Sequence, residues 1–371
     1  MQTRRILFAC LMTLAVAVPA RAAMMTNGST TKSFYVQTNL DGFGVAAKKK
    51  DKLLINPWGL AFGPGTAIWI ADNNSGLATV YTPAGKLIKP IVTIPVPSGK
   101  SGLAAPTGVV FNPRQSEFGG GLFIFCTEDG TISTWAQSNG SMAQLVVDNS
   151  AKNAVYKGIA LGTNASGDLL FATDLNNAVV TVFDKNFNEV TVPGGFIDPS
   201  LPANFSPFGI TNINGDLYVS YAMPDSARTD EVNAAGNGFV DVFDTDGSLI
   251  RRLISNGALN SPWGMALAPS NFGTLSGDLL VGNFGDGHIN AFDPTTGANV
   301  GQLTGMKGQA LVVGGVWSLV FGDGSVGATN TLYFTGGPNN QSAGIFGTFT
   351  PKTVKTVMGG GMMGGGGGGG Y

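Results

Sequence analysis

The chain has 371 residues, of which 43% are hydrophobic and 12% are charged, and its formal net charge is −2. This hydrophobic content excludes a disordered chain. The basic residues form no stripe that could neutralise a row of phosphates, so we expect no nucleic-acid partner.

The first 22 residues are typical of a secretory signal peptide. Arg4 and Arg5 precede an apolar run over residues 6–18, and the Ala-Arg-Ala sequence at residues 20–22 offers a small-x-small cleavage site. This run is too short to cross a bilayer and no later segment is long enough, so we expect no transmembrane segment. The sequence therefore predicts an exported protein, periplasmic or extracellular, whose mature part keeps one cysteine, Cys126, and forms no internal disulfide.

Residues 23–55 form an N-terminal arm, and within it residues 34–40 alternate between apolar and polar side chains as a strand does. From residue 56 onwards a short pattern recurs six times, at steps of 49, 50, 51, 55 and 54 residues. A period near fifty with β-type content is typical of four-stranded blades. We therefore predict an all-β, six-bladed β-propeller over residues 56–351. The repeated position, which we call the marker, is held by Gly59, Gly108, Gly158, Gly209, Gly264 and Ser318.

Each repeat reads as four antiparallel strands. In the first repeat the strands are expected at residues 60–62, 67–71, 78–81 and 88–94, with turn residues between them. Later second and third strands are expected at residues 169–172 and 179–183, 216–221 and 239–243, 278–281 and 289–292, and 331–335 and 345–349.

The sixth repeat lacks a clear outer strand. We predict that residues 34–40 supply it, because such closure removes the exposed edge of the last sheet. The alternative for the same place is the segment 353–358. Residues 352–371 are rich in glycine and methionine and are expected to be a flexible tail.

Several strings carry a resemblance to known proteins. A Pro-x-Gly-Ile-Ala pattern followed by an Ile-Trp-Ile-Ala-Asp-like strand resembles NHL repeats. Over about residues 34–350 the chain resembles an uncharacterised family of exported bacterial proteins, which implies a six-bladed propeller and secretion but no known activity. The strings that carry this second resemblance are residues 35–40, 56–59, 238–244, 259–264 and 280–287.

More distantly, the expected fold is similar to that of gluconolactonase- and paraoxonase-like hydrolases, which hold a calcium ion on the ring axis. In such proteins the metal needs an acid near the start of the inner strands. A departure at these positions weakens the hydrolase interpretation, since they hold Pro57, Pro106, Tyr156, Pro207, Pro262 and Val316.

The loops that lead into the inner strands carry aromatic residues next to the marker. If these side chains ring the channel mouth, they form an apolar surface with one cation, suited to a sugar, an aromatic metabolite or a peptide side chain. Their recurrence at one repeat position instead favours rings that are buried between blades. The candidate ligand-binding residues in this set are Trp58, Lys157, Phe208, Trp263 and Trp317.

The loops between second and third strands are rich in Asp and Asn. Converging carboxylates and amides could hold calcium, and the candidates are Asp72, Asp129, Asp174, Asn283 and Asp286. The alternative, which recurrence favours, is that each side chain caps its own turn.

The fourth repeat breaks the symmetry with a long charged loop at residues 222–238, where a binding element would lie. Its candidate residues are Asp225, Arg228, Asp230 and Glu231, and the alternative is a solvated insertion without a specific role. His288 is the only histidine, which excludes a zinc site made of several histidines.

Taken together, the sequence predicts a secreted, monomeric binding or interaction module for a small molecule, a glycan or a protein. The binding face is expected to be the one that carries the loops into the inner strands and the 222–238 loop. The alternative function is a calcium-dependent, lactonase-type hydrolase with an axial metal.

Overall fold

The computed structural model describes residues 29–357, and Ser33–Thr353 form one compact unit. The remaining described residues, at the outer ends of the first and last strands, belong to a second unit. The predicted signal peptide and most of the predicted tail lie outside the described residues. Within residues 29–357, no helix is long and apolar enough to cross a membrane.

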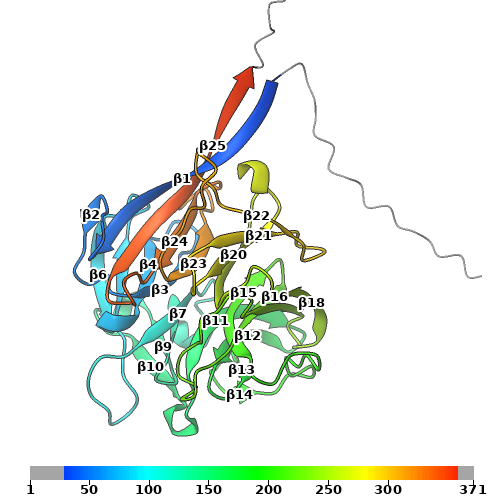
Figure 1. Ribbon diagram of the computed structural model, residues 1–371. Helices are drawn as coiled ribbons and strands as arrows, with labels where there is room; N and C mark the ends of the chain where they lie inside the picture. The colour runs from blue at the N-terminus through cyan, green and yellow to red at the C-terminus, as the bar shows by residue number, and fades with distance from the viewer. Residues whose placement is uncertain (1–28, 358–371) are drawn as a thin grey trace, which may run out of the picture. The chain divides into compact units, whose positions relative to one another are not determined.

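Six sheets stand as blades around a common centre, so the chain is a six-bladed β-propeller as the repeats predicted (Figure 1). Blade one contains β3 (Pro57–Ala61), β4 (Ile68–Asp72), β5 (Leu77–Tyr81) and β6 (Leu87–Thr93). Blade two contains β7 (Pro106–Phe111), β8 (Phe123–Thr127), β9 (Thr131–Trp135) and β10 (Gln144–Asp148). Blade three contains β11 (Tyr156–Asn164), β12 (Gly167–Asp174), β13 (Val179–Asp184) and β14 (Glu189–Val190).

Blade four contains β15 (Ser206–Ile213), β16 (Asp216–Ala222), β17 (Phe239–Phe243) and β18 (Leu249–Ser255). Blade five contains β19 (Pro262–Leu267), β20 (Leu279–Asn283), β21 (Ile289–Phe292) and β22 (Asn299–Gln302). Blade six contains β23 (Val316–Phe321), β24 (Leu332–Gly336), β25 (Gly344–Val357) and β1 (Ser29–Phe43), and β2 (Lys49–Lys50) pairs with β1. Short 3-10 helices lie at Asn73–Ser75, Phe118–Gly120, Gln137–Asn139, Ser150–Lys152 and Gly273–Leu275.

The ring is closed by the N-terminal strand, since β1 is the neighbour of β25 in the sheet order. The prediction for residues 34–40 is therefore confirmed, and the alternative segment from residue 353 is the end of β25. Tyr35 of β1 ties this closure to blade five. Its buried hydroxyl donates to the Phe272 carbonyl at 2.9 Å and accepts from the Leu275 amide at 3.2 Å.

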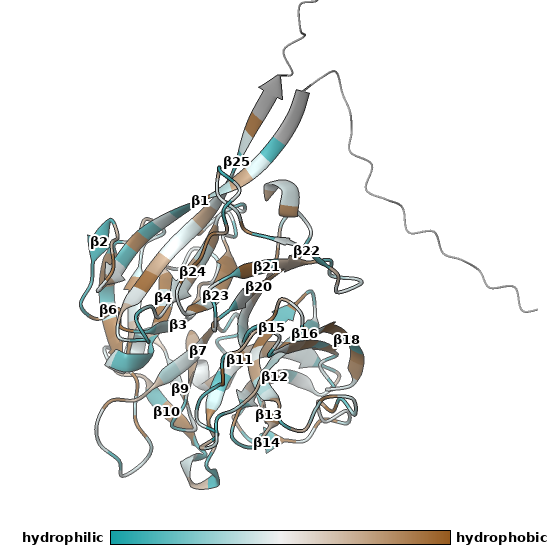
Figure 2. Cartoon of the chain, in the orientation of Figure 1, coloured by the Kyte–Doolittle hydropathy of each residue, from teal (hydrophilic) through white to brown (hydrophobic). Residues whose placement is uncertain are grey.

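Blades pack face to face through apolar side chains, and the strands are coloured largely white to brown in Figure 2. Between blades one and two, Trp69 stacks on Phe123 with ring centroids 4.6 Å apart and also contacts Trp135. Such burial of flat aromatic faces is a large apolar contribution to stability.

In the first repeat the inner strand begins earlier than predicted, at Pro57. Proline is tolerated there because it is the first residue of the strand.

The marker glycines lie where inner strands of neighbouring blades approach most closely. A Cβ atom on Gly264 would lie 2.1 Å from the Trp317 carbonyl oxygen, and one on Gly59 would lie 2.6 Å from the Thr107 carbonyl oxygen. Blade six has Ser318 at this position, and the Ser318 hydroxyl accepts a hydrogen bond from the Leu60 amide at 2.9 Å. The repeated glycine therefore serves the spacing of the ring.

In three of the blades, a buried hydroxyl of the second strand joins that blade to the next one. In blade six, Thr335 Oγ1 accepts from the Ser318 amide at 3.1 Å and donates to the Trp58 carbonyl at 2.5 Å. Thr173 and Ser220 make the same two kinds of contact, within their own blade and with the following inner strand. This bridge satisfies backbone groups at the ring centre that would otherwise be buried without partners.

Candidate functional site

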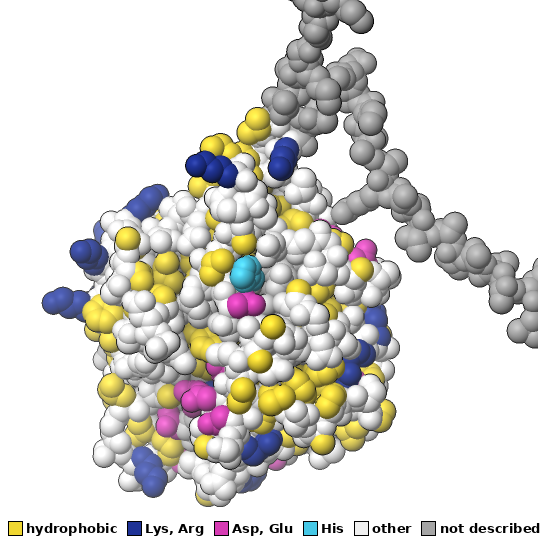
Figure 3. Space-filling model, in the orientation of Figure 1, with side chains coloured by type: hydrophobic (Ala, Val, Ile, Leu, Met, Phe, Trp, Pro, Cys, Tyr) yellow, Lys and Arg dark blue, Asp and Glu magenta, His cyan; other side chains and the backbone are white. Residues whose placement is uncertain are grey.

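The candidate site lies on the face of the ring where the inner strands begin, which we call the mouth face. Inner and second strands are antiparallel, so the start of each inner strand lies beside the end of its second strand, as in the pairs Pro57–Asp72 and Tyr156–Asp174. Loops from both positions therefore converge around the axis. In the face shown in Figure 3, several acidic side chains gather in one patch, another lies beside the histidine, and most basic side chains lie towards the edge.

The aromatic residues of this face are buried against one another. Trp58 stacks on Trp317 with centroids 3.5 Å apart, and Trp317 stacks in turn on Phe284 at 4.1 Å. Phe208 and Trp263 meet Trp58 edge-on, at 6.4 and 6.0 Å. We call these five residues the axial aromatic cluster; all are less than a tenth exposed. They expose no ring face on which a ligand could stack, and they fill the centre of the ring.

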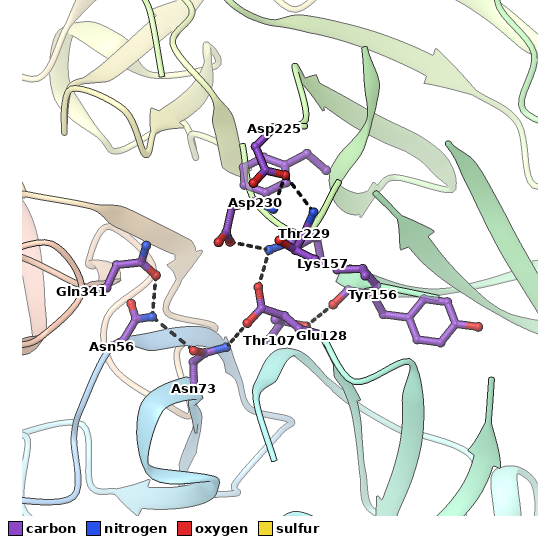
Figure 4. A network of polar contacts seen from close by, with 12 residues as sticks. Asn56, Asn73, Thr107, Glu128, Tyr156, Lys157, Asp225, Thr229, Asp230 and Gln341 are labelled. Atoms are coloured by element: carbon purple, nitrogen blue, oxygen red, sulfur yellow. Dashed lines mark hydrogen bonds and ion pairs between the residues drawn. The ribbon is translucent and has the colours of Figure 1, made fainter. Parts of the chain in front are cut away.

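Lys157 extends from β11 above this cluster. Its side chain is fully buried, its Nζ lies 5.1 Å from the centre of the Trp58 ring, and it forms ion pairs with Glu128 and with Asp230 Oδ1, the latter at 3.2 Å (Figure 4). Burial alone would lower the pKa of Lys157. The carboxylates of Glu128, Glu231 and Asp230 outweigh burial and raise that pKa above its ordinary value, so the ammonium stays charged.

Amide side chains extend this ion pair across further blades (Figure 4). Asn73 Nδ2 donates to Glu128 Oε2 at 3.0 Å, and Asn56 Nδ2 donates to Asn73 Oδ1 at 3.3 Å and to Gln341 Oε1 at 2.7 Å. The Trp317 indole donates to Asn56 Oδ1 at 3.0 Å and so joins the network to the aromatic cluster. We call the whole set the mouth network: Lys157, Glu128, Asp230, Glu231, Asn73, Asn56 and Gln341.

Two polar atoms at this site are buried without a partner within residues 29–357: Glu231 Oε2 and Trp58 Nε1. Burial raises the pKa of Glu231 to about 8, against the opposing effect of the Lys157 ammonium. The side chains of Glu128 and Asp230, in contrast, are 23% and 61% exposed. The network therefore has a solvent-accessible side and an unsatisfied buried side, an arrangement that a bound ligand or ordered water would complete.

The long loop at residues 222–238 contributes to the site in two ways. Asp230 and Glu231 approach Lys157, whereas Asp225 and Arg228 fix the loop itself. The Asp225 carboxylate accepts from the amides of residues 229 and 230, at 3.0 and 3.3 Å. The Arg228 guanidinium donates to the carbonyls of residues 176 and 175 and to the Ser206 hydroxyl, at 2.6, 3.1 and 2.8 Å.

The calcium candidates are engaged in local turns or neighbouring loops. Asp72 accepts from the Thr79 hydroxyl at 2.6 Å, and Asp129 accepts from the amide of residue 105 at 2.8 Å. Asp174 and Asp286 accept hydrogen bonds from backbone amides within three residues along their own loops. The side-chain amide of Asn283 donates to the carbonyl of residue 258. Among the described residues, no group of three or more His, Cys, Asp or Glu side chains could hold a metal ion.

From the sequence candidates, the structure thus brings Lys157, Asp230 and Glu231 together beside the axial aromatic cluster. That cluster contains the other aromatic candidates, Trp58, Phe208, Trp263 and Trp317. The structure adds Glu128, Asn73, Asn56 and Gln341, which were not predicted as site residues. Glu128 could have been found from the sequence, because a glutamate there departs from the repeat. The corresponding loops of blades one and three carry aspartate and asparagine.

No family model matches the sequence. Two solved structures with the same fold are a glucose dehydrogenase and a gluconolactonase from Xanthomonas campestris. The first has a TM-score of 0.54 and 13% identity, covering 84% of this chain and 99% of that one. The second has a TM-score of 0.51 and 14% identity, covering 80% and 86%. At these identities the likeness concerns the fold alone.

Two of the sequence relatives are uncharacterized proteins of Acanthamoeba polyphaga mimivirus. One is 32% identical over 343 residues, which cover 88% of this chain and 87% of the viral protein. The other is 32% identical over 319 residues, which cover 81% and 76%. These relatives are viral, whereas the sequence resemblance was to bacterial proteins, and export and NHL repeats stay predictions. Because the similarity extends over most of both viral proteins, the chain belongs to the family that they represent.

Proposed function

We propose that the protein is a binding module whose mouth network holds a small polar ligand rich in hydrogen-bond donors, a polyol or an amine. The observation that carries this proposal is the pair of buried, unpartnered atoms, Glu231 Oε2 and Trp58 Nε1, beside a fully buried lysine. Buried polar groups in native proteins are nearly always paired. A ligand hydroxyl would pair both, because it can donate to Glu231 Oε2 and accept from the Trp58 indole, whereas an ammonium would pair only the carboxyl oxygen.

The charge of the network favours a donor ligand. Three carboxyl groups face one ammonium, and the acceptor oxygens of Glu128 and Asp230 are accessible from solvent. A ligand hydroxyl or ammonium donates to such oxygens, whereas an anion would be repelled.

The network also departs from the ring symmetry. Lys157 occupies a position that is aromatic in four other blades, and replacing a buried ion pair by apolar packing is often neutral or stabilising. Stability of the ring therefore does not require a lysine here.

We further propose that the protein acts outside the cytoplasm, because residues 1–22 are typical of a signal peptide.

Isothermal titration calorimetry tests the proposal with two probe sets, neutral sugars (glucose and galactose) and polyamines (putrescine and spermidine). We expect one set to bind the wild-type protein. The Asp230→Asn and Glu128→Gln variants should each weaken that binding about tenfold, because each loses a charge-assisted hydrogen bond. The matched control, Glu189→Gln, changes an acid at the outer strand of blade three and should bind as the wild type does. The proposal is overturned if neither probe set binds, or if all variants bind as tightly as the wild type.

The alternative, a calcium-dependent hydrolase, makes a separate prediction. A saturable rise in melting temperature on adding calcium, reversed by a chelator, would support a metal-dependent role. The binding proposal expects no such rise.

A further inference from the structure

A cavity lies at the centre of the ring, and it is separated from the mouth network by the axial aromatic cluster. It has a volume of about 470 Å³, within the usual range for small-molecule sites. All six inner strands line it, and β3, β7, β11, β15 and β23 can be followed around the centre in Figure 1. Its lining starts at the marker residues and runs to the ends of the inner strands. One side chain per blade illustrates the lining: Leu60, Val109, Ile159, Ile210, Met265 and Leu319.

The cavity is capped at one end and opens at the other. Trp263 belongs both to its lining and to the axial aromatic cluster, so the cluster separates it from the mouth network. At the opposite end, which we call the exit face, Phe62, Phe111, Leu161 and Val320 are half-buried. The side chains that line the cavity are mainly apolar and suit an apolar guest. The inner strands are the edge strands of their sheets, so their backbone groups add polar contacts around that guest.

A smaller pocket that contains charged side chains adjoins the axial cavity on the exit face. This second pocket, of about 290 Å³, shares Pro113, Leu161 and Asn212 with the first. It contains Arg114, whose guanidinium forms an ion pair with Asp168. The Asp168 carboxylate is 7% exposed and also accepts from the Thr163 hydroxyl at 2.5 Å.

Arg114 is thus held by a buried partner and still has free donors. Its side chain is 53% exposed, and within residues 29–357 its guanidinium makes no hydrogen bond other than the one to Asp168. A guanidinium has five N–H donors in a fixed plane. The remaining donors are available to a ligand that accepts hydrogen bonds at the edge of the apolar cavity.

We propose that this exit-face cavity binds a small amphiphilic molecule, with an apolar ring or chain in the axial cavity and a hydrogen-bond-accepting head on Arg114. The site lies on the other side of the axial aromatic cluster from the mouth network. Its occupancy is therefore independent of the function proposed above.

The test uses anilinonaphthalene sulfonate, which has an apolar ring body and a sulfonate acceptor and becomes fluorescent in apolar surroundings. We expect saturable binding to the wild-type protein, with energy transfer from the tryptophans of the axial aromatic cluster. Leu161→Trp and Val320→Trp fill the cavity from blades three and six and should abolish the binding. The control Ile250→Trp adds the same ring at an exposed position of β18 and should leave binding unchanged.

A second pair of variants tests the head group. Arg114→Met should weaken the probe about tenfold, the effect expected for one hydrogen bond to a charged group. Lys185→Met removes an exposed cation that pairs with Glu117 and serves as its control. Circular dichroism and melting confirm that each variant is folded. No saturable binding, or equal binding by the cavity-filled variants, overturns the proposal. If only Asp230→Asn abolished dye binding, the dye would bind at the mouth face, and the exit-face site would be rejected as well.

Discussion

Lys157 is the residue on which the mouth face depends most. Its ammonium is fully buried and compensates the charges of its two ion-pair partners, Glu128 and Asp230. Lys157→Met removes this compensation and leaves the carboxylates facing an apolar side chain. We expect the free energy of unfolding to fall by about 3 kcal/mol, near the lower end for a broken buried pair, because Glu128 and Asp230 keep contact with water. Urea denaturation followed by circular dichroism measures this loss.

Lys152→Met is the control for that prediction. Lys152 pairs with Glu189 on the surface, where the two side chains are 59% and 47% exposed. Exposed pairs contribute little, so a change below about 1 kcal/mol is expected. Similar losses in the two variants would contradict the central role of Lys157.

Glu231 gives the mouth face a dependence on pH. Burial raises the pKa of Glu231 from 4.5 to about 8 in the folded protein. As pH rises between these two values, the unfolded chain loses the Glu231 proton before the folded protein does, so stability falls across this window and levels off above it. Glu231→Gln cannot lose a proton, so its free energy of unfolding should fall less over the same range.

Urea denaturation at a series of pH values from about 5 to 9 compares the two proteins. Burial also raises the pKa of Asp241 to about 6, with Arg252 opposing it, and this effect has the same sign. Asp241 is present in both proteins, so their difference isolates Glu231. Parallel pH profiles would show that Glu231 is not held in its protonated form.

At the scale of the element, the bridging hydroxyl of β24 joins blade six to blade one. Thr335→Val keeps the shape of the side chain but leaves the Ser318 amide and the Trp58 carbonyl without this partner. We expect a loss of about 1–3 kcal/mol in the free energy of unfolding, measured by urea denaturation. Thr335→Ser keeps the hydroxyl and should lose clearly less. A serine variant as unstable as the valine variant would assign the effect to the methyl group.

The strands could be predicted from the sequence because their signals are local. Residues 239–243 and 289–292 were predicted with the bounds that the structure shows, since an apolar run between turn residues fixes a buried strand. The marker glycines set the period, and the close approach of inner strands explains why glycine is required there.

The mouth network could not be predicted in the same way, because its partners come from different blades. Asn56 and Gln341 are 285 residues apart and meet only when the ring closes. Recurrence indicated structural roles at the repeated aromatic and Asp/Asn positions. In the structure the rings are buried together and the acids serve their loops. Residue types that break the repeat, such as Lys157, are the better guide.

At the scale of the whole molecule, the axial aromatic cluster divides the ring centre into two compartments. The mouth network lies on one side of Trp263, whose indole donates to the Lys157 carbonyl at 3.0 Å. The apolar cavity lies on the other side. Each compartment is built from residues of at least five blades, so both depend on a closed ring.

Closure itself rests on β1, and Tyr35 is its most deeply anchored large side chain, at 2% exposed. Tyr35→Ala creates a cavity beside Phe272 and removes two hydrogen bonds, so we expect a loss of about 3–5 kcal/mol in the free energy of unfolding. Val36→Ala changes the next residue of the strand, which is 37% exposed, and should have little effect. Hydrogen exchange locates the loss. If β1 closes the ring, amides of β24 and β25 should exchange faster in Tyr35→Ala while those of β16 keep their protection. A uniform increase over all blades would instead mean that the ring opens as one unit, and that the last blade is no weaker than the others.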